Sequence, residues 1–306
     1  MKERLWEFKY APTKWEDLII NDDLKPILKK NLDERPNMLL YGSPGVGKGS
    51  YVDVLMSHND LKSSTMKINA SLEGGIETIR SKVLPFAQAS NFELDKLKLV
   101  YLNEVDHPNL AVSQGSLRQL MEDVQKTTQF VLVCNYIENI IPELKSRCQV
   151  YQVGNPPAKE IYSKCEYILN NENIKFNKKS LIQLVKKCYP DIRSTIISLR
   201  QNVVDGKLSD NIIISSSDTL FADILSAIKS GDPEQVRKKL KSNTIFYPQL
   251  YEYLYKQIME SENSVFKNDA EAILLIGEHH YRDSMVAIKE INFIHMVFQM
   301  LKKGCI

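Results

Sequence analysis

Long apolar runs and a secretory signal are both missing from this chain of 306 residues. No apolar run approaches the ~18 residues that a membrane span needs. The N-terminal sequence MKERLWEFKY has none of the apolar core that a signal peptide requires. We therefore expect a cytoplasmic protein that has no membrane partner.

Cysteine is too sparse and too scattered for a disulfide framework or a zinc site. The chain has five cysteines, an odd number, and no two of them form a CxxC pair. We expect reduced and mostly buried thiols, as is usual inside cells. The five are Cys134, Cys148, Cys165, Cys188 and Cys305.

A large excess of positive charge is also missing. The 40 lysines and arginines oppose 38 acidic residues, which leaves a formal net charge of +2. A dedicated nucleic-acid binder often carries a larger basic excess. Any contact with DNA must therefore come from a local arrangement of cations, or from several copies of the chain acting together.

The first half of the chain contains short apolar segments that alternate with helix-like segments. A chain of this length predicts two or three domains, and the alternation predicts a parallel sheet with helices on both faces. The expected strands are residues 38–41, 66–69, 97–102 and 130–134, and the expected helices are residues 50–57, 76–90 and 110–125.

The pattern changes after Val153. Residues 154–157 (GNPP) break the chain, and helical patterns alone fill residues 158–201. A second break at residues 202–218 contains Ser215-Ser216-Ser217, and residues 218–304 are again helical, with helix starts at Asp232-Pro233 and Tyr247-Pro248. We predict an α/β domain at residues 1–154 and two helical domains at residues 155–217 and 218–306.

Residues 42–50 read GSPGVGKGS between an expected strand and an expected helix. Gly42, Gly47 and Lys48 fit the P-loop pattern GxxxxGK. The glycines let backbone N–H groups turn toward phosphate oxygens, and Lys48 can reach the β and γ phosphates at the positive end of a helix. The predicted nucleotide-binding loop consists of Gly42, Ser43, Pro44, Gly45, Val46, Gly47, Lys48, Gly49 and Ser50.

One position departs from the P-loop pattern. A Ser or Thr normally follows the lysine and binds Mg²⁺ through its hydroxyl group. This chain has Gly49 there, so Ser50 becomes the candidate metal ligand. The order Lys-Gly-Ser also resembles adenylate kinases and leaves a nucleoside monophosphate kinase as an alternative, although no arginine-rich substrate lid is evident.

Asn103 and Glu104 follow the strand at residues 97–102, where P-loop ATPases place Asp-Glu. In those enzymes the Asp holds Mg²⁺ and the Glu orients the attacking water. Glu104 is therefore a candidate catalytic residue. Asn103 is a candidate metal ligand, although an amide oxygen is neutral and weaker than a carboxylate.

Taken in order, the P-loop, Asn103-Glu104, a strand-ending Asn135 and Ser146-Arg147-Cys148 resemble AAA+ sliding-clamp-loader subunits. The resemblance covers nearly the whole chain. Residues 69–89 and Ile276-Gly277-Glu278 look most like the ATPase subunit of T-even-type bacteriophages. Replication factor C small subunits are similar in their motifs, and one of them shares the departures at positions 49 and 103.

The resemblance implies a P-loop AAA+ domain with a parallel sheet, followed by a helical lid (155–217) and an all-α collar (218–306) that assembles a ring with other clamp-loader subunits. It implies that Arg147 is an arginine finger that reaches the ATP of a neighbouring subunit. By the same resemblance, Asn135 senses the γ-phosphate and Arg193 is a lid residue that touches the same nucleotide.

The resemblance also implies ATP and Mg²⁺ as cofactors, and a sliding clamp and primer–template DNA as partners. Arg80 matches a residue that contacts template phosphates inside the ring, and Lys82 lies near it. Both lie outside the apolar stripe of the helix expected at residues 76–90. Gly74-Gly75, which precede this helix, let the backbone approach a ligand. The chain would act in the host cytoplasm if it serves viral DNA replication, and in the nucleus if it is eukaryotic. The stripe consists of Ile76, Ile79, Val83 and Phe86.

A subunit that binds nucleotide but does not hydrolyse it is the second alternative. Gly49 and Asn103 alter both usual protein contacts to the metal and favour this alternative. Glu104, Asn135 and Arg193 favour a working ATPase, which we take as the main hypothesis.

Overall fold

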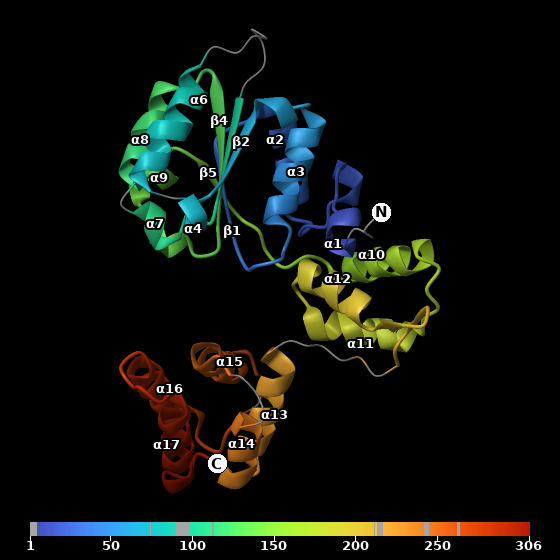
Figure 1. The fold of residues 1–306 in the computed structure, drawn as a ribbon, viewed down its shortest axis with the longest axis vertical. Helices are drawn as coiled ribbons and strands as arrows, with labels where there is room; N and C mark the ends of the chain where they lie inside the picture. The colour runs from blue at the N-terminus through green and yellow to red at the C-terminus, as the bar shows by residue number, and fades with distance from the viewer. Residues whose placement is uncertain are drawn as a thin grey trace. The chain divides into compact units, whose positions relative to one another are not determined.

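The computed structural model describes residues 5–73, 75–89, 98–111, 113–210, 212, 217–241, 245–261 and 264–306. The chain divides into two compact units, Met1–Ile213 and Ile214–Ile306 (Figure 1). Each unit has its own apolar core. Some residues of the sequence patterns lie outside the described residues, namely Gly74, Ser90, Leu97, Val112, Ser215 and Ser216.

The first unit is built on a parallel sheet of five strands in the order β2-β3-β4-β1-β5. The four expected strands are confirmed. The fifth, β5, was not predicted because its sequence QVYQ is short and mostly exposed at the edge of the sheet. The strands are β1 (Met38–Tyr41), β2 (Thr65–Asn69), β3 (Lys98–Asn103), β4 (Thr128–Cys134) and β5 (Gln149–Gln152).

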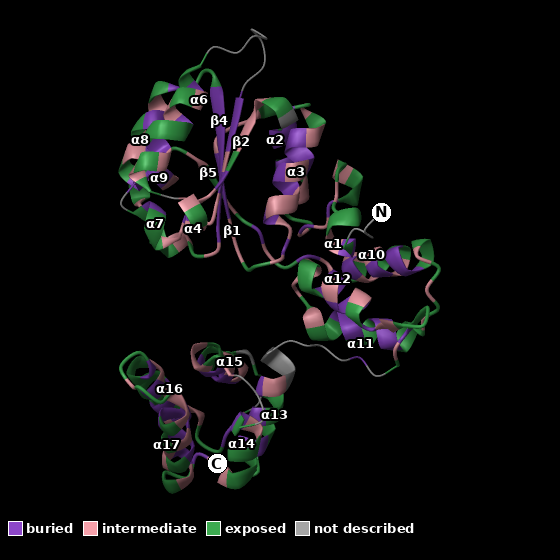
Figure 2. Cartoon of the chain, viewed as in Figure 1, coloured by how far each residue is buried: buried purple, intermediate pink, exposed green. Residues whose placement is uncertain are grey.

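Helices cover both faces of this sheet, as the alternating pattern predicted (Figure 1). Successive strand residues point to opposite faces, so Leu39 packs into one core and Leu40 into the other. Both are fully buried, which stabilises the fold by about 1.5–3 kcal/mol for each side chain. Figure 2 shows the central strands buried and the outer helix faces exposed. One face carries α2 (Lys25–Glu34) and α3 (Lys48–His58), and the other carries α6 (Leu84–Gln88), α8 (Gln114–Asp123) and α9 (Pro142–Lys145).

The helix expected at residues 76–90 contains a π-helical turn. The segment η3 (Ile79–Val83) lies between α5 (Ile76–Thr78) and α6, and its wider hydrogen-bonding pattern is typical of functional positions in helices. Ile79 and Val83 are buried as expected, whereas Ile76 and Phe86 are only half-buried. Ala87 completes the buried stripe, because it lies four residues after Val83.

Residues 158–201 form three helices, α10 (Ala158–Asn171), α11 (Lys178–Cys188) and α12 (Ile192–Gln201). The break that follows contains a small hairpin, in which Asp205 and Gly206 both adopt positive φ between β6 (Val203–Val204) and β7 (Lys207–Leu208). These helices belong to the same compact unit as the sheet. The division into domains at residues 154 and 217 therefore stays a prediction.

The regular secondary structure described in the second unit is all helical. Asp232-Pro233 and Tyr247-Pro248 lie at helix starts as predicted, and Asp232 Oδ1 accepts a hydrogen bond from Glu234 N at 2.9 Å. None of the described helices of the chain is both long and apolar enough to cross a membrane. The helices are α13 (Ser217–Lys229), α14 (Pro233–Lys241), α15 (Tyr247–Glu260), α16 (Asp269–Asp283) and α17 (Lys289–Lys302).

Candidate functional site

A cavity of about 450 Å³ opens in the first unit where β1, β3 and β4 end. Parallel strands bring their carboxyl ends to the same edge of a sheet, which is where α/β proteins usually bind ligands. The cavity collects residues from the P-loop, the strand ends and α12. The predicted site residues that line it are Pro44, Gly45, Gly47, Lys48, Gly49, Ser50, Asn103, Glu104, Asn135 and Arg193.

The P-loop has a backbone that only glycine fits. Gly42, Gly45 and Gly47 have φ values of 147°, 74° and 106°, which other residues rarely adopt. A Cβ atom at Gly45 would lie 2.0 Å from Asp191 Oδ1, and one at Gly42 would lie 2.3 Å from Val153 O. Such a close backbone curve fits a phosphate cradle.

Lys48 lies at the mouth of this loop and is only 6% exposed. Its ammonium group donates hydrogen bonds to Gly42 O (2.7 Å), Ser43 O (2.8 Å) and Asn135 Oδ1 (2.9 Å). Burial lowers the pKa of Lys48, because the charged form loses water that these neutral acceptors replace only in part. An anionic phosphate would supply the missing negative charge. The contact with Asn135 joins two of the predicted site residues.

Asp106 fixes the position of Asn135. Its Oδ2 atom accepts hydrogen bonds from Asn135 N (3.0 Å) and Tyr136 N (2.8 Å). Sequence reasoning missed Asp106, although it follows Glu104 by two residues at the same strand end. That spacing is the signal that could have identified it.

Oxygen donors suited to Mg²⁺ lie beside the P-loop. Ser50, Asp53, Asn103 and Glu104 all line the cavity. Among the described residues, no three His, Cys, Asp or Glu side chains cluster closely enough to hold a metal by themselves. Mg²⁺ usually takes only one or two protein ligands and completes its shell with phosphate and water. The donors present therefore fit the ion as a nucleotide-bound cofactor.

Glu104 has a left-handed backbone, with φ of 57°. This conformation is costly for a residue with a side chain and is concentrated at functional sites. It places Glu104 on the cavity wall immediately after β3.

The lid side of the cavity contacts the P-loop directly. Ile192 N donates to Gly45 O at 3.1 Å, and the Asp191 side chain caps α12 by accepting from Ser194 N at 2.8 Å. Arg193 follows in the first turn of α12 and lines the cavity. These contacts explain how a residue of the lid reaches the nucleotide loop.

The N-terminal segment forms another wall that sequence reasoning missed. Tyr10 and Pro12 line the cavity. Lys9 Nζ and Tyr10 OH each donate to Glu172 Oε1 at 2.5 Å, which ties this segment to the end of α10. The residues are distant in sequence, so no local pattern could have identified the contact.

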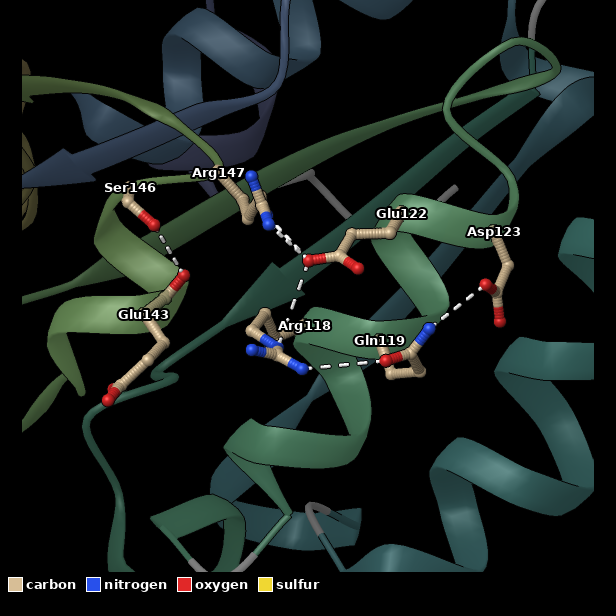
Figure 3. Close-up of polar contacts among 7 residues, drawn as sticks. All are labelled: Arg118, Gln119, Glu122, Asp123, Glu143, Ser146 and Arg147. Carbon is tan, nitrogen blue, oxygen red and sulfur yellow. Dashed lines mark hydrogen bonds and ion pairs between the residues drawn. The ribbon is translucent and has the colours of Figure 1, made fainter.

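Arg147 is not among the residues that line the cavity. It points instead toward Glu122 of α8 (Figure 3). Its Nε and Nη2 atoms lie 2.7 Å and 2.5 Å from Glu122 Oε1 on α8, and Arg118 Nε lies 3.9 Å from the same oxygen. The Arg147 side chain remains 48% exposed. The structure thus places it apart from the nucleotide loop of its own chain, and its role as a finger stays a prediction.

Arg80 and Lys82 lie on the exposed side of η3. The Lys82 ammonium group forms an ion pair with Glu73. Arg80 forms an ion pair with none of the residues that the structure describes. Their role in DNA binding stays a prediction. Of the other loop residues, Val46 is fully buried, and Ser43 contributes a backbone carbonyl to Lys48.

Comparison with known proteins identifies two domains. Residues 38–154 match the ATPase family associated with various cellular activities (AAA). Residues 157–215 match the AAA+ ATPase lid domain of the sliding-clamp-loader large subunit. The second match argues against a nucleoside monophosphate kinase.

Three relatives illustrate the range. The replication factor C small subunit of Sulfurisphaera tokodaii is 28% identical over 99% of this chain and 97% of its own length. The sliding-clamp-loader large subunit of Escherichia phage RB69 is 28% identical over 98% of this chain and 96% of its own length. Replication factor C subunit 5 of Homo sapiens is 31% identical over 68% of this chain and 63% of its own length.

Proposed function

Since this chain belongs to the clamp-loader subunit family of AAA+ ATPases, we propose that it uses ATP to open a sliding clamp and load it at primer–template junctions during DNA replication. One observation carries the proposal. Lys48, Asn103, Glu104, Asn135 and Arg193 come from four separate segments and line one cavity beside the P-loop.

Each residue has a physical task in this proposal. The N–H groups of the P-loop and Lys48 bind the phosphates, and the contact of Lys48 with Asn135 would let Asn135 respond to the terminal phosphate. Glu104 orients the attacking water. Mg²⁺, held through Ser50 and Asn103, would neutralise phosphate charge. Arg193 would couple the lid to the same nucleotide.

In the proposed ring, Arg147 would act on the ATP of a neighbouring subunit. An arginine that stabilises the transition-state charge in a neighbouring subunit must lie on an accessible surface away from its own cavity, and Arg147 is half-exposed in such a place. We assign residues 1–154, 155–217 and 218–306 to the ATPase domain, the lid and the ring-forming collar. The proposed partners are other clamp-loader subunits, the clamp and primed DNA. The chain would act where DNA is replicated.

A subunit that binds ATP without hydrolysing it is the second candidate. The observation that favours it is the absence of both usual metal contacts, since Gly49 and Asn103 stand in their positions. Retention of Glu104, Asn135 and Arg193 at one cavity supports hydrolysis instead.

The deciding experiment is a turnover assay on the purified chain and on the assembled ring, each with and without primed DNA and the clamp. We expect hydrolysis that rises when DNA and clamp are both present. ATP binding without turnover in every combination would favour the scaffold subunit. Lack of ATP binding would contradict both candidates.

A further inference from the structure

A tyrosine hydroxyl lies close to Gly49, the position where a P-loop usually has a Ser or Thr hydroxyl. Tyr101 on β3 precedes Asn103 by two residues, so both face the same side of the sheet. A Cβ atom built on Gly49 would lie 3.6 Å from the Tyr101 hydroxyl oxygen. Tyr101 lines the cavity, and its hydroxyl forms a hydrogen bond with none of the residues that the structure describes.

A phenol hydroxyl can donate a hydrogen bond as well as accept one, and the carboxylate of Asp53 lies in the same cavity. Asp53 lies one helical turn after Gly49 on α3, lines the same cavity and remains 49% exposed while its Oδ1 atom lies 3.0 Å from Lys67 Nζ. A hydroxyl donor and a carboxylate therefore line the same cavity as the P-loop.

We propose that the Tyr101 hydroxyl takes over the task of the hydroxyl missing at position 49 and, with Asp53, orients the water shell of nucleotide-bound Mg²⁺. This inference rests on the proposed nucleotide site. Mg²⁺ keeps several of its waters in proteins, so groups that bind those waters can replace a direct ligand. The phenol can donate to a water or phosphate oxygen, and the carboxylate can accept from a water.

This assignment explains both departures from the usual ATPase motifs, Gly49 in the P-loop and Asn103 at the end of β3. Gly49 and Asn103 both weaken direct contact with the metal. Tyr101 shares a face of β3 with Asn103, and Asp53 lies about one turn after Gly49 on α3. Groups of this outer kind typically change metal affinity about 10- to 100-fold when they are removed.

The test is the Mg²⁺ concentration that half-saturates binding of a fluorescent ATP analogue to the full chain. Tyr101→Phe removes only the hydroxyl and should raise that concentration about tenfold, while affinity measured in EDTA stays unchanged. Tyr51→Phe is the matched control, because the Tyr51 hydroxyl is fully buried and donates to Leu28 O at 3.2 Å. It should leave the Mg²⁺ dependence as in wild type.

A rescue variant separates this role from a structural one. A Cβ atom at 3.6 Å is an ordinary van der Waals contact, so Gly49→Ser can be accommodated. Combined with Tyr101→Phe, it should bring the half-saturating Mg²⁺ concentration back to within about twofold of wild type, because it returns a hydroxyl to the usual P-loop position.

Asp53→Asn supplies a second route if Tyr101→Phe folds poorly, because Asp53 is half-exposed. Asp53→Asn should also raise the half-saturating Mg²⁺ concentration. Lys67→Met removes only the ion-pair partner of Asp53 and should leave that concentration unchanged. Unchanged Mg²⁺ dependence in Tyr101→Phe or in Asp53→Asn, with ATP binding intact, would overturn the inference and leave the proposed function standing. Wild-type protein that binds no ATP would instead contradict the proposed function.

Discussion

Lys48 occupies a costly position for a charged side chain. Its ammonium group is buried and is satisfied by two carbonyl oxygens and one amide oxygen, none of which carries a full negative charge. The carboxylates of Asp106 and Asp191 act on it electrostatically, but no carboxylate forms an ion pair with it among the described residues. A buried ammonium that lacks a direct ion pair destabilises the folded chain, and a ligand that brings its own negative charge would relieve this cost.

Lys48→Ala should therefore abolish ATP binding, because the loop loses its cationic phosphate ligand. Isothermal titration of the variant with ATP measures this directly. Lys98→Ala is the matched control, since Lys98 is also buried but donates to backbone carbonyls of Phe86 and Ala89 away from the cavity. ATP affinity equal to that of wild type in Lys48→Ala would show that the P-loop assignment is wrong.

Asp106 acts on the same site through the backbone. Asp106→Ala should leave Asn135 N and Tyr136 N without their charged acceptor, at a cost of about 1.5–3 kcal/mol in the free energy of unfolding. Because Asn135 then loses its fixed position, turnover should fall more than ATP affinity does. Denaturant unfolding and steady-state hydrolysis measure the two effects. Asp123→Ala, which removes an exposed contact with Gln119, is the control and should change neither.

Individual site residues could be predicted from the sequence where a contiguous motif contains them. Gly42 to Ser50 form one contiguous stretch that runs into the start of α3, so their pattern alone predicted a segment that lines the cavity. Tyr101, Asp53 and Tyr10 could not be predicted in the same way. They reach the cavity from a strand interior, a helix and the N-terminal segment, and only the tertiary fold brings them together.

At the scale of elements, apolar runs predicted the inner strands β1, β3 and β4, which are mostly buried, and also the edge strand β2. The other edge strand, β5, escaped prediction because most of its residues are exposed and form no apolar run. The π-helical turn η3 escaped because one inserted residue changes the hydrogen bonds without removing the apolar stripe of Ile79, Val83 and Ala87.

The N-terminal segment and the end of α10 are held together by one partly buried carboxylate, that of Glu172. Hydrogen bonds from Lys9 and Tyr10 lower the pKa of Glu172 below its ordinary value of 4.5. A lowered pKa means that the contact stabilises the fold above pH 4.5 and that this contribution is lost as the pH falls through the lowered value.

Glu172→Gln should weaken ATP affinity by at most about fivefold, because solvent screens an ion pair whose lysine is 48% exposed. Nucleotide binding and thermal unfolding, measured between neutral pH and pH 3.5, check this. Wild type should lose stability relative to the variant only below about pH 4.5. Glu166→Gln, whose partner Tyr162 lies away from the cavity, is the control. A constant difference between wild type and variant over the whole pH range would contradict the assigned role.

At the scale of the whole molecule, the proposed function depends on neighbouring subunits. Arg147→Ala should spare ATP binding and lower hydrolysis in the assembled ring by about 10³–10⁵, the usual effect of an arginine finger. Arg118→Ala is a useful comparison, because Arg118 lies farther from Glu122, at 3.9 Å, and should change turnover far less. Normal turnover in a ring of Arg147→Ala subunits would leave Arg147 as a surface charge held by Glu122.

If the chain binds DNA as proposed, its low net charge favours several copies acting together or a local arrangement of cations. Arg80 is exposed on η3 and forms an ion pair with none of the described residues, whereas Glu73 already engages Lys82. A ring would repeat Arg80 along the phosphate backbone, so a formal charge of only +2 in each chain does not prevent binding. Each phosphate that a cation contacts releases counterions, and this makes the affinity depend on salt.

Arg80→Ala should therefore weaken binding of primed DNA equally for different sequences, and reduce the slope of log affinity against log salt by about 0.9 for each lost phosphate contact. It should also lower DNA-stimulated hydrolysis more than basal hydrolysis. The measurement is a salt titration of DNA affinity for wild-type and variant rings. Arg282→Ala removes the same charge from an ion pair within α16 and is the charge-matched control. Parallel slopes and equal affinities for Arg80→Ala and wild type would exclude Arg80 from the DNA interface.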